Sequence, residues 1–254
     1  MRETRILMGM PVTVEIADAA AETDGRGSAV VRSVFEYFGY IDEKFSTYRE
    51  GSEISAINRG ELGRKERSRD METIFRLAEE TKELTGGYFD IRLPGPVGKY
   101  DPSGIVKGWA ILNAANLVKD AGYADFYVDA GGDIQTGGLN AEGEKWSVGI
   151  RNPWRASENV RIVRLSGEGI ATSGTYVRGS HIYNPKTGKA ADEIASLTVI
   201  GPDAYEADRF ATAAFAMGEG ALRFLEEARG LEGYMIKNDR TAAATSRFKK
   251  FTAP

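Results

Sequence analysis

The order of hydrophobic and polar positions predicts a strand followed by helices in the first third of the chain. Residues 4–17 alternate apolar and polar side chains, which is typical of a half-buried strand. After a small, polar loop over 19–28, apolar residues follow helical spacing over 28–45. Another helix is predicted over 68–87, because Ser68 suits an N-cap and two glycines end the pattern.

The rest of the chain mixes strands with two more helices. Residues 90–103 contain three prolines and two glycines, so we expect an irregular crossing there. Helices are predicted over 104–119 and 203–228, the second broken near Gly218 and Gly220. Strand-like runs cover 124–130, 145–151, 160–166, 194–200 and about 233–237. Because strands and helices do not alternate strictly, the sequence predicts an α+β fold with a largely antiparallel β-sheet core and helices packed on its faces.

Composition narrows the class of protein. The 254 residues carry a net charge of -4, and this balance gives no electrostatic footprint for nucleic acid. The absence of cysteine excludes disulfides, thiolate metal sites and thiol nucleophiles. No apolar run approaches the roughly 20 residues of a membrane helix, and the first residues do not resemble a signal peptide. We therefore expect a cytoplasmic protein with a single domain over residues 1–254 and no membrane span.

The helix predicted from residue 203 carries the most distinctive polar pair. Asp208 and Thr212 stand four residues apart and therefore share one helix face. A carboxylate and a hydroxyl would be costly if buried unpaired on this apolar, small-residue stretch. A hard cation such as magnesium would pair them, because it prefers oxygen ligands. The alternative is that Asp208 bonds Arg209 or faces solvent. Asp203 and Glu206 form a capping-box pattern at the helix start.

A second candidate site follows the strand predicted near residue 126. The strand runs into Gly131-Gly132-Asp133, and two glycines let a backbone approach a ligand closely while free N–H groups cradle an anion. Neither a dinucleotide fingerprint nor a P-loop is present. The alternative is a tight turn between strands, in which Asp129 and Asp133 cap backbone N–H groups.

Three further side chains are candidates for ligand contacts. Lys107 follows the turn that opens a helix, and a helix N-terminus with a lysine suits a phosphate; the alternative is a solvated lysine. His181 is the only histidine, so it cannot complete a His-rich zinc site, but it could contact a phosphate or an acceptor. Tyr48 could stack on an aromatic ring, although its segment, with Ser52 capping a short helix, also reads as packing.

Taken in order, seven motifs resemble the ApbE-like family of FAD:protein FMN transferases over about residues 6 to 247. They are FSTYREGSEISAIN, GGYFD, DPSGIVKGWA, VDAGGDI, ATSGTY, SHIYNPKTG and PDAYEADRFATAAFAMG. The resemblance implies that the FMN moiety of FAD is moved onto a threonine or serine hydroxyl of an acceptor flavoprotein subunit. AMP is released, and Mg2+ is the usual ion. Some members of the family instead hydrolyse FAD to FMN and AMP.

The resemblance also implies roles for individual residues. Asp208 and Thr212 would bind the metal together with the backbone carbonyl of Gly104, and Lys107 would lie near the pyrophosphate. His181 would lie close to the reacting phosphate, so the implied catalytic set is His181, Asp208 and Lys107. The other residues that it places around the FAD are Met8, Tyr48, Asp129, Gly131, Gly132 and Asp133.

Departures from the family pattern keep several functions open. Only about a dozen residues connect GGYFD to DPSG, where many relatives carry a longer segment. Met10 stands where relatives often have threonine, and Ser180 where another histidine is common. We expect the short connection to trim the wall around the flavin or the acceptor groove. FMN transfer is the leading hypothesis. An FAD pyrophosphatase, a non-catalytic FAD-binding protein and an interaction domain are the alternatives, and Asp208, Asp129 and His181 are all conceivable bases.

Overall fold

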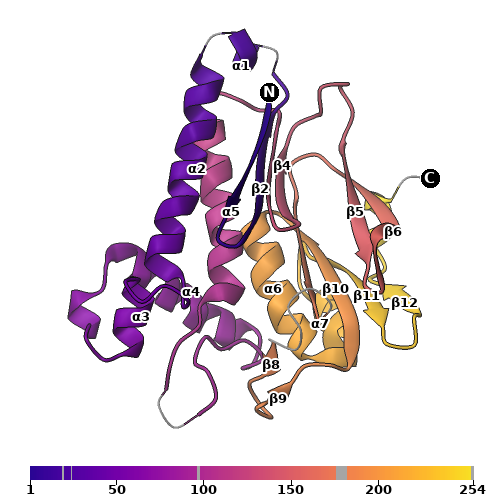
Figure 1. Cartoon of the computed structure of the whole chain (residues 1–254). Helices are drawn as coiled ribbons and strands as arrows, with labels where there is room; N and C mark the ends of the chain where they lie inside the picture. Colours follow the sequence, from indigo (N-terminus) through magenta and orange to yellow (C-terminus); the bar gives the residue numbers. More distant parts are fainter. Residues whose placement is uncertain (19, 24, 96–97, 176–181, 253–254) are drawn as a thin grey trace.

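One antiparallel sheet organises the molecule (Figure 1). The computed structural model describes residues 1–18, 20–23, 25–95, 98–175 and 182–252. The eight strands of the sheet, in spatial order, are β1 (Arg2–Leu7), β2 (Met10–Ile16), β3 (Phe126–Ala130), β4 (Asp133–Gly137), β7 (Gly169–Gly174), β10 (Ile194–Gly201), β11 (Glu232–Lys237) and β12 (Ala242–Ala244). Every neighbouring pair is antiparallel, which confirms the predicted α+β class.

Helices cover the sheet, and two small hairpins complete the described chain. The hairpins are β5 (Trp146–Asn152) with β6 (Arg155–Leu165), and β8 (Tyr183–Asn184) with β9 (Lys189–Ala190). The α-helices are α1 (Ala20–Thr23), α2 (Arg26–Phe45), α3 (Glu53–Asn58), α4 (Arg69–Leu84), α5 (Ser103–Asp120), α6 (Ala204–Ala216) and α7 (Ala221–Glu227). Short 3-10 turns lie at η1 (Arg64–Glu66), η2 (Gly218–Gly220) and η3 (Phe248–Phe251). Among these residues no helix combines the length and apolar character that a bilayer crossing requires.

Most helix predictions are confirmed, and local hydrogen bonds explain where the helices begin. The side chain of Ser68 accepts a hydrogen bond from the Met71 N–H at the start of α4, and Ser52 caps α3 in the same way. The last predicted helix breaks into α6 and α7 at Gly218, which adopts a left-handed φ of 59°. The N-caps therefore identified where α3 and α4 begin, and the glycines where the last helix breaks, but the predicted loop over 19–28 contains α1 and the start of α2.

One strand prediction needs correction, and several strands were missed. The strand predicted over 4–17 is a hairpin of β1 and β2, because Met8 (φ 52°) and Gly9 (φ 70°) turn the chain between them. β4 and β7 were not predicted as strands. β4 is buried along its whole length, so it lacks polar alternation, and β7 consists mainly of small residues. Residues 90–103 are irregular as expected, with one isolated bridge between Arg92 and Tyr100.

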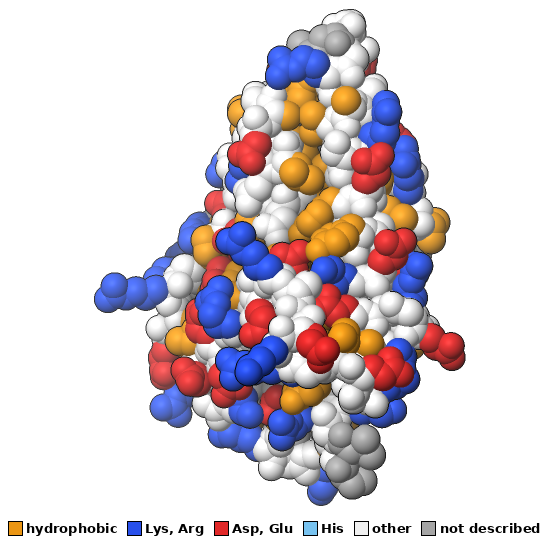
Figure 2. All heavy atoms as spheres, turned by 90° about the vertical axis from the view of Figure 1, so that its left-hand side faces the viewer, with side chains coloured by type: hydrophobic (Ala, Val, Ile, Leu, Met, Phe, Trp, Pro, Cys, Tyr) orange, Lys and Arg blue, Asp and Glu red, His pale blue; other side chains and the backbone are white. Residues whose placement is uncertain are grey.

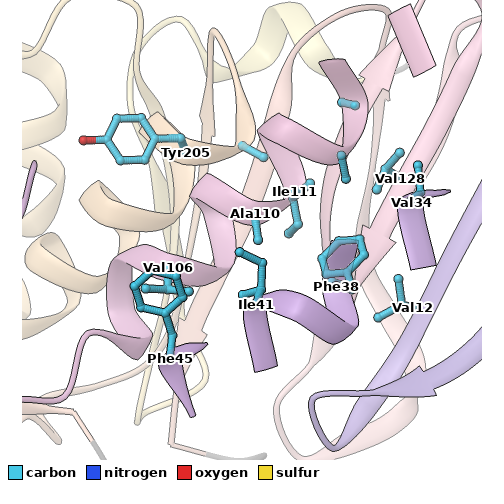
Figure 3. Close-up of a cluster of buried hydrophobic side chains, with 14 of the residues drawn as sticks. Val12, Val34, Phe38, Ile41, Phe45, Val106, Ala110, Ile111, Val128 and Tyr205 are labelled. Atoms are coloured by element: carbon cyan, nitrogen blue, oxygen red, sulfur yellow. The ribbon is translucent and has the colours of Figure 1, made fainter. Parts of the chain in front are cut away.

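The largest core lies between the first strands of the sheet and the helices α2, α4 and α5. Figure 3 shows Phe38 and Ile41 of α2 meeting Ala110 and Ile111 of α5, all of them fully buried. A second cluster lies between α6, α7 and the strands β7, β10 and β11, while a third joins the opposite face of those strands to the β5–β6 hairpin. Both faces of this half of the sheet are therefore covered.

The two halves of the face that carries α2 differ in the kind of side chain that they expose. Figure 2 shows hydrophobic side chains along its upper half and crowded charged side chains on its lower half. The lower part includes α3 and α4, and the segment that joins them contains the charged run predicted over 58–67. Salt bridges there join exposed side chains, such as Arg59 with Glu61, and each contributes little to stability.

Candidate functional site

A buried cluster of one cation and two carboxylates forms where α5, α6 and the β3–β4 turn converge. The Lys107 ammonium of α5 makes an ion pair with the Asp133 carboxylate of β4 and lies 3.7 Å from Oδ1 of Asp208 on α6. Asp133 is 2% exposed and Asp208 is 3% exposed. Buried carboxylates need a partner of opposite charge, and Lys107 supplies it. Lys107 is therefore ion-paired and only partly exposed, unlike the solvated lysine of the alternative.

Asp208 is held by the backbone of α5. The Gly108 N–H donates to Oδ2 of Asp208 at 2.7 Å. A Cβ at position 108 would lie 2.5 Å from the Cβ of Asp208 and 2.5 Å from the carbonyl oxygen of Ala204, so only glycine permits this approach of the two helices. Burial raises the pKa of Asp208 to about 7, an effect that the Lys107 charge opposes. Both alternatives for Asp208 are wrong: it does not face solvent, and Arg209 bonds Glu206 and Thr81 instead.

Thr212 and Gly104 lie side by side next to this cluster. A Cβ on Gly104 would stand 3.0 Å from Cγ2 of Thr212 and 3.5 Å from its hydroxyl oxygen. Thr212 is one helical turn beyond Asp208, so both side chains face the start of α5. In a regular helix the Gly108 N–H bonds the carbonyl of Gly104. Because that N–H also donates to Asp208, the Gly104 carbonyl retains acceptor capacity.

These three residues fit a magnesium ion by donor chemistry. A carboxylate, a hydroxyl and a backbone carbonyl are all oxygen donors, and magnesium takes few protein ligands because it keeps several waters. Among the described residues, no group of three or more His, Cys, Asp or Glu side chains could hold a metal. A cation at this place would therefore rest on Asp208 and neutral oxygens, with its remaining positions left for water or a phosphate.

The glycine pair between β3 and β4 forms a tight turn, as the structural alternative predicted. Gly131 and Gly132 have left-handed φ angles of 67° and 98°. Oδ1 of Asp129 accepts from the Gly132 N–H at 2.7 Å, and Oδ1 of Asp133 accepts from the Thr172 N–H at 3.0 Å. Burial raises the pKa of Asp129. The same turn still presents Asp133 to Lys107, so the structural and the ligand-binding interpretations are compatible.

The structure places the other predicted residues in different parts of the molecule. A Cβ on Gly131 would meet the Met10 sulfur at 2.8 Å, so the β1–β2 turn, with the partly buried Met8, packs beside the β3–β4 turn. Tyr48 is 96% exposed and lines a separate pocket of about 240 Å³ with Tyr100 and Asp101, just before α5. His181 lies outside the described residues.

Two polar contacts anchor the start of α6; the sequence analysis identified one of them in part and missed the other. Asp203 caps the Glu206 N–H at 2.8 Å, but the Glu206 side chain binds Arg209 at 2.6 Å, so only half of the predicted capping box is formed. Gln135 of β4, fully buried, accepts from the Ala204 N–H at 2.8 Å. The Gln135 contact left no local signal in the sequence, because its partner Ala204 is 69 residues away.

Comparison with known proteins gives consistent matches. A model of the ApbE family matches residues 8–100 and 91–235. A protein of Salmonella typhimurium named FAD:protein FMN transferase is 34% identical over 149 residues, which are 55% of this chain and 43% of that protein. A protein of the same name from Escherichia coli is 32% identical over 164 residues, which are 59% of this chain and 47% of that protein. The chain spans about half the length of the curated relatives it matches.

The fold matches over nearly the full length of solved structures. The flavin transferase ApbE from Vibrio cholerae superposes with a TM-score of 0.82 at 25% identity, covering 99% of this chain and 98% of that one. An ApbE protein from Thermotoga maritima superposes with a TM-score of 0.85 at 22% identity, covering 100% and 99%. The second likeness concerns the fold alone.

Proposed function

This chain belongs to the ApbE family, and we propose that it transfers the FMN moiety of FAD to a threonine or serine hydroxyl of an acceptor protein, with release of AMP. The family match agrees with the resemblance seen in the ordered motifs. The relatives named FAD:protein FMN transferase support the activity, although each match covers about half of their length. The fold by itself would not establish this activity.

The observation that carries the proposal is the cluster of Lys107, Asp133 and Asp208. Its two carboxylates are buried beside the partly exposed Lys107 ammonium, and a substrate pyrophosphate is an anion that needs a cation at a protected place. Lys107 is one turn into α5, so its ammonium is within reach of a phosphate at the helix start. In this proposal Lys107 turns from Asp133 towards the pyrophosphate and contributes a positive charge there.

Asp208, Thr212 and the carbonyl of Gly104 would hold the magnesium ion. When bound, magnesium would neutralise pyrophosphate charge and stabilise the leaving phosphate of AMP. The Gly108 N–H holds Asp208 in the orientation that faces α5. Since the oxygens around the attacked phosphorus carry negative charge, this positioning of charges is the main catalytic task of the chain.

The reaction also needs an acceptor hydroxyl and a place for its proton. The hydroxyl oxygen would form a bond to the phosphorus on the FMN side as the bond to the AMP oxygen breaks, and the proton would pass to a base. Asp129, Asp208 and His181 remain candidates for that base. Met8 and Tyr48 would flank the flavin nucleotide, and the exposure of Tyr48 leaves its ring available for stacking.

AMP release and protein labelling test the proposal together. The protein is incubated with FAD and magnesium, with and without a lysate of its host, and flavin fluorescence is followed on protein bands. We expect AMP and a fluorescent acceptor band. AMP and free FMN without a labelled protein would indicate the pyrophosphatase instead, and no AMP under any condition would refute both enzymatic functions.

A matched pair of substitutions on one helix tests the metal ligand. Asp208→Asn should abolish magnesium-dependent AMP release, because an amide cannot replace the ligand charge. Asp203→Asn makes the same chemical change at the N-cap of α6, where asparagine also caps well, and should retain activity. Full activity of Asp208→Asn would refute the metal assignment.

A further inference from the structure

A buried glutamine on the sheet bonds the first residue of the helix that carries Asp208. Gln135 of β4 is 0% exposed, and its Oε1 accepts from the Ala204 N–H at 2.8 Å. Its Nε2 donates to the carbonyls of Gly167 and Thr136, each at 2.9 Å. The partners fix the orientation of the amide, because a backbone N–H only donates and a carbonyl only accepts. A buried side chain with all of these bonds made is a specified contact rather than an incidental one.

The hydrogen bond to Gln135 is made by the N-terminal end of α6. The first N–H groups of a helix have no partner within the helix, and Asp203 satisfies that of Glu206. Gln135 satisfies that of Ala204 from a different element. Asp208 is four residues after Ala204, hence on the same helix face and one turn along the axis. Fixing Ala204 to β4 therefore fixes the position of Asp208 along the α6 axis relative to Asp133, which lies on β4 together with Gln135.

Most of α6 packs through buried side chains such as Phe210 and Phe215, but its first turn meets the neighbouring elements partly through glycines. The first turn of α6 lies between two glycines: a Cβ at Gly169 of β7 would collide with the backbone of Asp203 and Ala204, and one at Gly108 would collide with Ala204 and Asp208. Glycine contacts allow close approach but offer no side-chain knobs that interlock. A smooth contact sets the separation of two elements, whereas a directional hydrogen bond sets their register.

We propose that Gln135 is a positioning residue for Asp208, which acts through the first turn of α6 to hold this carboxylate in place for a metal ion. The metal-binding part of this proposal rests on the proposed function, whereas the positioning of the Asp208 carboxylate does not. Removing the amide lets the first turn slide between the glycines, which lengthens the Gly108–Asp208 hydrogen bond and misplaces the ligand.

Gln135→Met tests the proposal, because methionine has a similar volume and makes none of these three hydrogen bonds. Thr245→Val is the matched control: Thr245 is buried and also accepts from a backbone N–H, that of Gly233, but it lies in the C-terminal segment. Both variants should melt at a lower temperature than the wild type. Only Gln135→Met should weaken the binding of Mn2+, used as a probe for magnesium, by about 10-fold to 100-fold. Gln135→Glu keeps the acceptor for Ala204 and should recover part of the affinity.

A second readout needs no metal. The Gly108 amide should exchange its hydrogen faster and shift its NMR resonance in Gln135→Met, but not in Thr245→Val. If both the Gly108 amide and Mn2+ affinity matched those of the control, the positioning role would be overturned. If the Gly108 amide responded as expected while the wild type bound no Mn2+ through Asp208, the positioning role would stand and the proposed metal site would fail.

Discussion

Replacing Lys107 with methionine removes the ammonium that lies between two buried carboxylates and so tests its contribution. Its ammonium is 3.7 Å from Oδ1 of Asp208, and its side chain is 23% exposed. At an effective dielectric constant of about 20, two unit charges at such a separation interact by about 4 kcal/mol. A divalent ion that binds Asp208 must displace this ammonium or tolerate its repulsion. If a third of that energy opposes the ion, removal of Lys107 tightens metal binding about tenfold.

The same substitution should weaken FAD binding, because it removes a positive charge proposed to meet the pyrophosphate. Opposite changes for the two ligands are therefore expected: Mn2+ alone binds more tightly to Lys107→Met, and FAD binds less tightly. Calorimetric titrations of each ligand, at one fixed pH for all variants, measure both. Lys119→Met, at the exposed C-terminal end of the same helix, is the control and should change neither. A loss of Mn2+ affinity in Lys107→Met would refute the competition between lysine and metal.

Two further predictions follow from the α5–α6 contact. Gly108→Ala should lower the free energy of unfolding by about 1–3 kcal/mol and weaken Mn2+ binding, because its Cβ would stand 2.5 Å from that of Asp208; denaturant unfolding and metal titration measure both, and an unchanged Mn2+ affinity would contradict the close contact. The raised pKa of Asp208, about 7, means that the folded protein holds a proton that the unfolded chain has released. The stabilisation that this group contributes is therefore present at low pH and lost as the pH rises through about 7. Mn2+ affinity should rise over the same pH range and then level off. An equally steep rise of Mn2+ affinity in Asp208→Asn would assign the pH dependence to another group.

The sequence was most informative where the chemistry is local. Asp208 and Thr212 were paired by helical spacing alone, and the N-caps Ser52 and Ser68 were identified by residue type and position. The break of the last helix near Gly218 followed from glycine placement. These features depend on neighbours within about one turn of chain, so the linear pattern contains them.

Features that depend on distant partners could not be predicted in this way. Lys107 and Asp208 are separated by about a hundred residues, and their contact exists because α5 and α6 pack through Gly108. The pattern of a turn followed by a helix, which suggested a solvated lysine, is equally compatible with an ion-paired lysine. β4 was missed because Gln135 and Thr136 are polar yet fully buried, which removes the alternation that marks a strand.

The strand order also has a consequence for how the chain acquires its site during synthesis. β4 lies between β3 and β7, and α6 follows only after β10, so Asp208 arrives when most of the sheet has already been made. Non-local pairings of this kind are slow to form, and domains that emerge from the ribosome fold progressively. A nascent chain that ends before Ala204 would hold Lys107 and Asp133 but no second carboxylate. Metal binding would then report that α6 has docked on the sheet, because its principal ligand appears only after six of the eight sheet strands.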